Sequence, residues 1–316
     1  MTRFVVGRLV GLVLTLLFSS FVIFGALYLA PGDPVAFLTG GRTVSPEVLD
    51  TLRAQYNLDD PFPVAYVNWL GGVLQGDFGR SVLNGESVST LIGARAGNTA
   101  LLVLVSSLLI LVAGIGSGVV AGLRPGKLDT SILLGSTFAL AIPSFVAAIV
   151  LISIFAVELS WFPVFGSGSG LGDRLYHLVL PAIALSLTSA AFVGRITRSA
   201  VRAELNREHV QTAISRGIPY RLIVRRHVVR NALIPITTVG TLTVASLIAG
   251  AAIVERAFNL NGIGGYLVQS VQAKDFPVVQ AICLILVATF VIVNMLVDIV
   301  YSLVDPRVRV MGEKRA

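Results

Sequence analysis

The chain has 316 residues, of which 55% are hydrophobic and only 13% are charged; its formal net charge is +7 and its mean hydropathy is +0.85. A soluble domain of this size carries about 25% charged residues, so the composition excludes an ordinary water-soluble globular protein. The only cysteine, Cys283, lies in an apolar run, which excludes an intrachain disulfide.

Six apolar segments are each long enough, or nearly so, to cross about 30 Å of hydrocarbon as a helix. In chain order they are residues 9–30, 99–122, 131–157, 178–194, 232–254 and 278–304. The first segment follows Arg3 and Arg8, as a signal peptide would. Its 22 residues exceed the core of about 7–15 residues that is typical of signal peptides, and Pro31 follows directly, so we expect a retained helix. The sequence therefore predicts an all-α integral membrane protein with six transmembrane helices.

The segment between the first two spans, residues 31–98, is too long for a simple connection. Its stretch SPEVLDTLRAQYN is typical of a helix, with Ser45 as N-cap, Pro46 as first residue and Glu47 in the first turn. A second stretch, DDPFPVAYVNWLGGVLQG, predicts a further short helix that ends at its glycines. We expect a small helical extracytoplasmic subdomain that lies over the membrane part.

The basic residues indicate the orientation. With the N-terminus inside, seventeen of the 24 Lys and Arg residues fall in cytoplasmic segments, including the tail at 305–316. Because basic residues in short loops favour the cytoplasm, both termini are predicted inside and residues 31–98 outside. The positive charge is thus a signal of membrane topology and lipid contact, and it does not indicate nucleic-acid binding.

Two features within the spans bear on packing and charge. Gly114, Gly118 and Gly122 recur at intervals of four in the second span, a spacing that lets helices approach closely, so we assign them to helix packing. Asp298 lies near the cytoplasmic end of the last span, and acids within spans are often functional. We favour a structural ion pair with Arg195, or with Arg198, over contact with a substrate.

The outer end of the fifth span combines an acid with a glycine-rich stretch. Glu255 and Arg256 end the span, and NLNGIGGYL, with Gly262 and Gly264, follows. Such a stretch is compatible with a re-entrant or gating segment. Glu255 is placed either to meet a cationic group from outside the chain, such as an amino terminus, or to pair with Arg256, and the sequence favours neither alternative.

The cytoplasmic loop at 195–231 carries the clearest candidate for a docking surface. Val210, Ala213, Ile214 and Gly217 fall on one helical face, where small residues permit close backbone approach. Gly217 and Pro219 then end one short helix and begin another, which is flanked by arginines including Arg221 and Arg225. Binding to anionic headgroups would explain the arginines but not the apolar face, so we favour protein docking, with lipid contact as a secondary role.

These residues carry a resemblance to a known family. QTAISRG, followed by RRHVVRNALIP, resembles the EAA signature of permease subunits of bacterial ABC importers, although Gln211 and Thr212 replace the first two letters of that signature. APGDP, LRAQYNLDDPFPVAYVNWLGGVLQGDFGRS, VERAFNLNGIGGYLVQSVQAKDFPVVQ and LVDPRVR extend the resemblance over nearly the whole chain. Together they resemble the first permease subunit of the dipeptide/oligopeptide/nickel family.

The resemblance implies a division of labour between subunits. It implies a second homologous permease, two ABC ATPase subunits docked at the loop, an extracytoplasmic substrate-binding protein, and a bacterial inner membrane. The chain itself is expected to be no enzyme and to bind no cofactor or metal, and RPGKLD lacks the residues of a phosphate-binding loop. The corresponding parts are a first helix at 1–30, the outer subdomain at 31–98, a five-helix core at 99–304 and a tail at 305–316.

Three alternatives remain at this point. A nickel or other small-solute ABC permease shares the same motifs. An ATPase-independent secondary transporter would be expected to show ionisable groups near mid-membrane and often an internal repeat, and neither is evident. An intramembrane serine protease is suggested only by GSGSG at 166–170, where a glycine-rich linker is the better interpretation.

Overall fold

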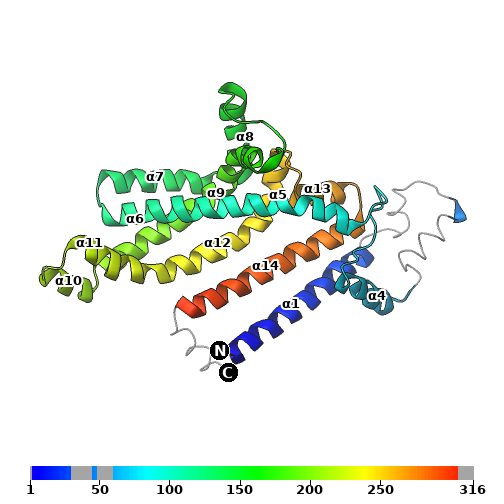
Figure 1. Ribbon diagram of the computed structural model, residues 1–316, viewed down its shortest axis with the longest axis horizontal. Helices are drawn as coiled ribbons and strands as arrows, with labels where there is room; N and C mark the ends of the chain where they lie inside the picture. Colours follow the sequence, from blue (N-terminus) through cyan, green and yellow to red (C-terminus); the bar gives the residue numbers. More distant parts are fainter. Residues whose placement is uncertain (1, 30–44, 48–59, 305–316) are drawn as a thin grey trace. The chain divides into compact units, whose positions relative to one another are not determined.

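The fold is taken from a computed structural model, which describes the backbone of residues 2–29, 45–47 and 60–304 (Figure 1). Side chains are described for the same residues apart from 2–5, 27–29, 241, 245 and 296–304. Beyond its first three residues, the helix predicted at 45–57 lies outside the described part of the chain.

The described residues are almost entirely helical, and their only strand pairing is a single bridge between Arg80 and Ser87. The α-helices are α1 (Thr2–Leu29), α4 (Phe62–Leu74), α5 (Val88–Leu109), α6 (Gly116–Leu123), α7 (Lys127–Ala141), α8 (Ser144–Leu151), α9 (Gly170–Leu205), α10 (Glu208–Ser215), α11 (Tyr220–Ile223), α12 (Arg230–Ala257), α13 (Ile263–Gln272) and α14 (Phe276–Val304). Three π-helical segments continue these helices: η1 (Ile110–Ile115), η2 (Ile152–Glu158) and η3 (Val224–Val229).

Four helices are long and apolar enough to cross a membrane, and the number rises to six when each of two bent helix pairs forms one span. The four are Val6–Ala26, Val88–Leu123, Gly170–Leu205 and Phe276–Met295, and the pairs lie within 127–158 and 220–257. The predicted all-α architecture is confirmed, and the six predicted spans correspond to four single helices and two bent helix pairs. The fourth span, predicted as 178–194 alone, is part of the much longer helix α9.

The third predicted span, 131–157, is wrong as a single straight helix. The chain bends by 103° between α7 and α8, at Ile142 and Pro143. Proline lacks an N–H donor and disfavours the α conformation in the residue before it. Ile142 accordingly adopts an extended conformation, with φ −90° and ψ 115°.

The chain divides into two compact units, which we describe separately. The first consists chiefly of Ala100–Leu260 and Val293–Ala316, and the second of Thr2–Thr99 and Asn261–Ile292. The second unit therefore combines segments that lie far apart in the sequence. The second unit combines the described part of the predicted outer subdomain with α1, α13 and most of α14.

In the first unit, three glycines let α9 pack directly against η1 and α6. A Cβ atom built on Gly118 would lie 2.5 Å from Cβ of Thr197, and one on Gly122 would lie 2.7 Å from Cγ1 of Val201. A Cβ on Gly114 would lie 2.9 Å from a backbone oxygen of α9. Real side-chain carbons do not approach so closely, so the glycines determine the spacing of these helices.

In the second unit, a buried carboxylate joins the turn before α5 to the corner between α13 and α14. Asp275 accepts hydrogen bonds from the Ser81 hydroxyl and, at 3.2 Å, from the backbone N–H of Val82. The Arg95 guanidinium lies 4.1 Å from the ring centroid of Tyr266. Burial raises the pKa of the Tyr266 phenol, and the nearby Asp275 carboxylate raises it further, so the ring stays neutral at physiological pH.

The second helix predicted in the outer segment is present as α4, and it contacts α1. Gly71 and Gly72 lie inside this helix, which ends at Leu74. Gly76, with φ +82°, then caps the helix in a conformation that favours glycine.

Candidate functional site

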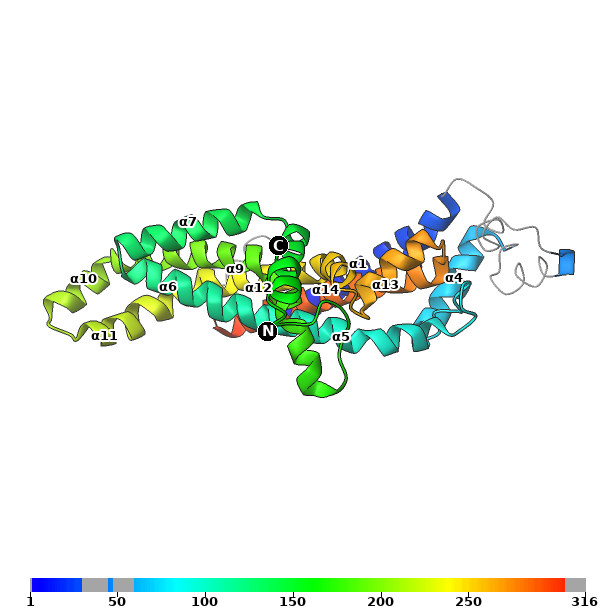
Figure 2. The same ribbon diagram turned by 90° about the horizontal axis from the view of Figure 1, so that it is seen from above.

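The α9–α12 connector, residues 206–229, lies at one end of the first unit, beyond α6 and α7 (Figures 1 and 2). It consists of α10, a turn at 216–219, and the continuous helical run of α11 and η3 that leads into α12. Arg207 leaves α9 in an extended conformation and precedes Glu208, the first residue of α10. The acidic Glu208 lies at the positive end of the helix dipole, where a negative charge is favourable.

Gly217 ends α10 with a helix cap that depends on its conformation. Its φ is +70°, its N–H donates to the carbonyl of Ile214 at 2.9 Å, and the N–H of Ile218 donates to the carbonyl of Ala213 at 3.2 Å. These two bonds form a Schellman motif, in which the residue after the helix adopts the left-handed conformation. A Cβ atom on Gly217 would contact nothing within 4 Å, so its conformation, and not crowding inside the chain, requires glycine here.

The four residues predicted to share a docking face divide between the interior and the surface. Val210 and Ala213 are buried, and they pack in a cluster with Val201, Ile223, Val228, Ala232 and Ile236. Ile214 is 47% exposed, and Gly217 is also exposed. The expectation that Val210 and Ala213 face a partner is therefore corrected, because these side chains hold α10 against its own unit.

The outward side of α10 is mainly polar. Glu208, Gln211, Thr212, Ser215 and Arg216 are exposed there, together with Ile214. After the turn, Tyr220 is 54% exposed, and Arg221 and Arg225 are exposed as well. We call this set, with Gly217, the α10 surface. It presents hydrogen-bonding groups, positive charge and two large apolar side chains on a short helix that protrudes from the unit.

Glu204, near the end of α9, links α9 to α10 and to α12. Its carboxylate accepts a hydrogen bond of 2.9 Å from the Asn231 amide of α12 and lies 3.3 Å from Nε2 of His209 in α10. It also lies 3.5 Å from Nε of Arg207. The Glu204 side chain is only 12% exposed, and a second histidine ring, that of His227, lies 6.1 Å from the ring of His209.

Apolar packing and the Glu204 carboxylate both hold α10 against its own unit. The buried residues press α10 against α9 and η3, while Glu204 bonds to residues of α10 and α12. These contacts link α10 to two long helices, α9, which is a span candidate, and α12, which is part of one.

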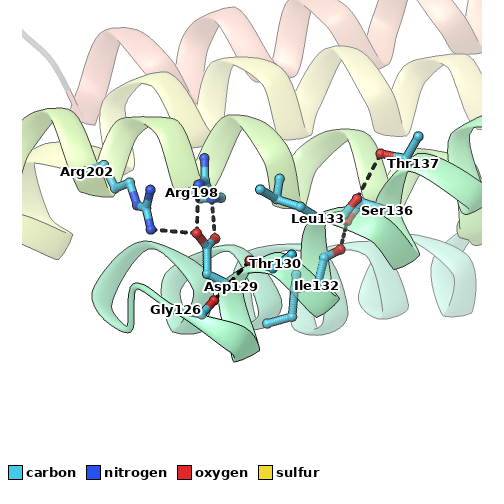
Figure 3. Close-up of polar contacts among 9 residues, drawn as sticks. All are labelled: Gly126, Asp129, Thr130, Ile132, Leu133, Ser136, Thr137, Arg198 and Arg202. Atoms are coloured by element: carbon cyan, nitrogen blue, oxygen red, sulfur yellow. Dashed lines mark hydrogen bonds and ion pairs between the residues drawn. The ribbon is translucent and has the colours of Figure 1, made fainter.

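A second polar cluster fastens α7 to α9 (Figure 3). Asp129, in the first turn of α7, accepts two hydrogen bonds from Arg198, at 2.5 and 2.8 Å, and one from Arg202 at 2.7 Å. Arg198 and Arg202 lie one turn apart on α9, so both reach the same carboxylate. The bidentate geometry with Arg198 makes this a strong, directional link between two helices.

The predicted pair of Asp298 and Arg195 stays a prediction, because the side chain of Asp298 lies outside the described residues. Arg195 is exposed. Arg198, which we considered as the alternative partner, donates two hydrogen bonds to Asp129.

The residues predicted at a pathway or gate fall in different units. Glu255 is fully buried near the end of α12 in the first unit. Gly262 and Gly264 belong to the second unit, where Gly262 precedes α13 and Gly264 is buried in its first turn. Among the described residues, no group of three or more His, Cys, Asp or Glu side chains is placed to hold a metal ion.

Sequence reasoning missed Glu204 and Asp129 as organising residues. Each is the acid that meets basic or amide side chains far away in the chain, at separations of 27 residues for Glu204 and Asn231 and 69 for Asp129 and Arg198. The available signal was that each is an acid beside a span end and close to basic residues: Arg124 and Lys127 precede Asp129, and Arg202 and Arg207 flank Glu204. Such an acid needs a partner when the segment folds against the membrane part.

Comparison with known families matches nearly the whole chain. Residues 114–310 match the family described as binding-protein-dependent transport system inner membrane component. Residues 1–103 match the N-terminal region described for the membrane component of such systems.

Curated relatives match over almost their full length. A probable peptide ABC transporter permease protein, y4tP of Sinorhizobium fredii, is 34% identical over 97% of this chain and 99% of the relative. The oligopeptide transport system permease protein AppB of Bacillus subtilis is 38% identical over 92% of each chain. The glutathione transport system permease protein GsiC of Escherichia coli K12 is 32% identical over 98% of this chain and 99% of the relative.

A solved structure supports the fold. An inward-facing structure of the MetNI methionine ABC transporter contains a chain that aligns with a TM-score of 0.54 and 18% identity. The alignment covers 68% of this chain and 96% of that one. At this identity the similarity applies to the fold alone.

Proposed function

The chain belongs to the family of binding-protein-dependent transport system inner membrane components, and from that premise we propose that it is the permease subunit of an ATP-driven importer of peptides. A permease subunit is not itself an enzyme, and ATP is hydrolysed by separate ATPase subunits. The observation that carries the peptide assignment is the near-complete match to relatives described as peptide and oligopeptide permeases.

The ATPase contact is assigned to the α10 surface. Ile214, Gly217, Arg221 and Arg225 are exposed, as contact with another subunit requires. Val210 and Ala213 support it from within, because they anchor α10 to its own unit. The cap at Gly217 gives α10 a defined end that a partner can recognise.

The coupling mechanism follows from the connections of α10. When two ATPase subunits close around ATP, each moves as a rigid body and pulls on the helix that docks into it. Glu204 and the buried cluster transmit this movement to α9 and α12. A tilt of these helices then opens the pathway toward one side of the membrane and closes it toward the other.

The assembly we propose contains two permeases, two ATPase subunits and a substrate-binding protein on the outer face. The second permease is homologous to this chain and encloses the pathway with it. Glu255, Gly262 and Gly264 are proposed at the pathway or its gate. Because Glu255 is fully buried in this conformation, any contact with a peptide amino terminus requires another conformation of the transport cycle.

The membrane is proposed to be the bacterial inner membrane, with both termini in the cytoplasm. The basic residues beside the spans support this orientation. It places the α10 surface inside, where the ATPase subunits are, and residues 31–98 outside.

The docking assignment is tested by photo-crosslinking in the assembled transporter. With p-benzoylphenylalanine in place of Gln211, irradiation is expected to join the chain to an ATPase subunit. The matched control is Leu171, which is 69% exposed at the opposite end of α9 and should form no such product. Crosslinking to the ATPase from Leu171 but not from Gln211 would contradict the assignment.

The substrate assignment has a second candidate, because glutathione relatives are also present and nickel permeases share the motifs. Uptake of a labelled tripeptide into cells that express all subunits should be competed by unlabelled di- or oligopeptides. Competition by glutathione alone, or by a nickel chelate alone, would replace the peptide assignment with that solute. The result is independent of the docking test.

A further inference from the structure

We propose that α4 lies across the first span in the outer part of the bilayer, with one face in contact with phospholipid. The helix has no charged residue within Phe62–Leu74, although charged residues flank it at Asp60 and Asp77. The proposal goes beyond the transport function, because it assigns a lipid surface to a segment that sequence patterns place in an outer subdomain.

The depth of α4 follows from its contacts with α1. The hydroxyls of Tyr66 and Ser20 share a hydrogen bond of 2.8 Å, and the ring of Phe62 lies 5.5 Å from that of Phe21. The apolar window of α1 extends at least to Ala26, the last residue of α1 whose side chain the structure describes. At about 1.5 Å per residue, Ser20 and Phe21 lie roughly 8–9 Å inside the end of that window. The inner side of α4 is therefore at membrane depth.

The direction of α4 follows from contacts made by both of its ends. Phe62 and Trp69 are seven residues apart, yet their ring centroids lie 5.6 and 5.2 Å from that of the same residue, Phe24. Between them, the ring of Tyr66 lies 5.7 Å from that of Phe24, and Tyr66 also bonds to Ser20, about one turn earlier on α1. In a helix that ran along α1, the contacts would shift steadily along α1 from one turn to the next, but Trp69 contacts Phe24 again. Therefore α4 crosses α1, and since α1 spans the membrane, α4 lies across the direction of the span.

The face of α4 turned away from α1 is apolar and exposed. Val64 is 47% exposed, Val67 is 64% exposed and Leu74 is 81% exposed. Their spacing of three and seven residues puts them on one helical face. On α1, Phe18 is 71% exposed and Val22 is 51% exposed, so this span candidate also presents apolar side chains at its surface.

Phospholipid fits this face better than water does. A helix within the hydrocarbon boundary that carries no charge gains by burying its apolar face among acyl chains. Tyr66 and Trp69, on the inner side, are of the type enriched at membrane interfaces. The polar Asn68, at the edge of the exposed face, bonds to Asp60 at 3.3 Å, which marks the border toward water.

The test uses the assembled transporter, reconstituted in phosphatidylcholine vesicles, with p-benzoylphenylalanine in place of Val67. After irradiation and mass spectrometry, we expect the peptide around residue 67 to gain the mass of one phospholipid. The positive control is Phe18 on α1, and the negative control is Asn84, an exposed polar residue in the turn before α5. Adduct yield at 67 should be comparable to that at Phe18 and well above that at Asn84.

Two outcomes would overturn the proposal. A crosslink from residue 67 to another protein subunit would show that a partner covers this face. A yield no greater than that at Asn84 would show that the face is in water. Capture of the ATPase subunits by each variant verifies assembly, and the readout does not depend on which solute the transporter carries.

Discussion

Three substitutions at Gly217 separate its conformational role from its proposed role in docking. Its φ of +70° is unfavourable for most residues, and a non-glycine residue there costs roughly 1–2 kcal/mol. That energy reduces the population of the capped helix about 5- to 30-fold relative to the uncapped one. Asparagine tolerates this conformation better than other residues, so Gly217→Asn should stay close to the wild type.

Gly217→Ala should lower coupling through conformation alone, because its Cβ would contact nothing within 4 Å inside the chain. Gly217→Trp adds bulk to the same conformational cost. Because this bulk meets open space within the subunit, any further loss must come from a partner. We therefore expect the order Asn, Ala, Trp for decreasing ATPase coupling.

The assay is capture of the ATPase subunits by the tagged permease, with substrate-stimulated ATP hydrolysis measured on the captured complex. Membrane insertion is monitored as a control for each variant. If Gly217→Trp captures as much ATPase as Gly217→Ala, the position is not docked and the reasoning fails. If Gly217→Ala matches the wild type, the helix cap has no part in coupling.

The remaining predictions concern the connection of α10, the packing of α9 and the topology. Glu204→Ala should weaken the attachment of α10 by about 1.5–3 kcal/mol, the range for hydrogen bonds to a charged group, and should lower the ratio of substrate-stimulated to basal ATP hydrolysis. Glu204→Gln keeps a hydrogen-bond acceptor and should retain more coupling, so equal stimulation in the wild type and both variants would contradict this role. Gly118→Ala should lower the melting temperature in detergent, because overpacking costs about 1–3 kcal/mol, whereas Gly116→Ala should not, since a Cβ there contacts nothing within 4 Å. Equal melting temperatures for the two variants would refute the packing account. In a cysteine-free background, an impermeant thiol reagent on whole cells should label Ser45→Cys but not Ser215→Cys, and labelling of the latter alone would invert the topology.

The spans were predictable because long apolar runs have few alternatives in a membrane. The break at Pro143 was visible as a proline, yet a proline inside a span can also be accommodated, as Pro181 is within α9. The size of the bend depends on how α7 and α8 pack, which hydropathy does not encode.

The α10 residues show a different limit. Helical spacing correctly groups Val210 with Ala213, but periodicity does not say whether a face meets its own chain or a partner. Ile214 lies next to Ala213 in sequence and nevertheless points outward. The position of Glu204 beside a span end could be read from the sequence, but its partners could not, because the cluster forms only when three helices come together.

The central claim is that this chain transports by coupling to separate ATPase subunits, and uptake with and without them tests it most directly. Labelled oligopeptide uptake is measured in cells that lack the endogenous system and express the two permeases and the binding protein. Adding the ATPase subunits should produce uptake, and replacing them with variants that cannot hydrolyse ATP should abolish it. Equal uptake in the absence of any ATPase subunit would contradict the account and indicate a self-sufficient transporter.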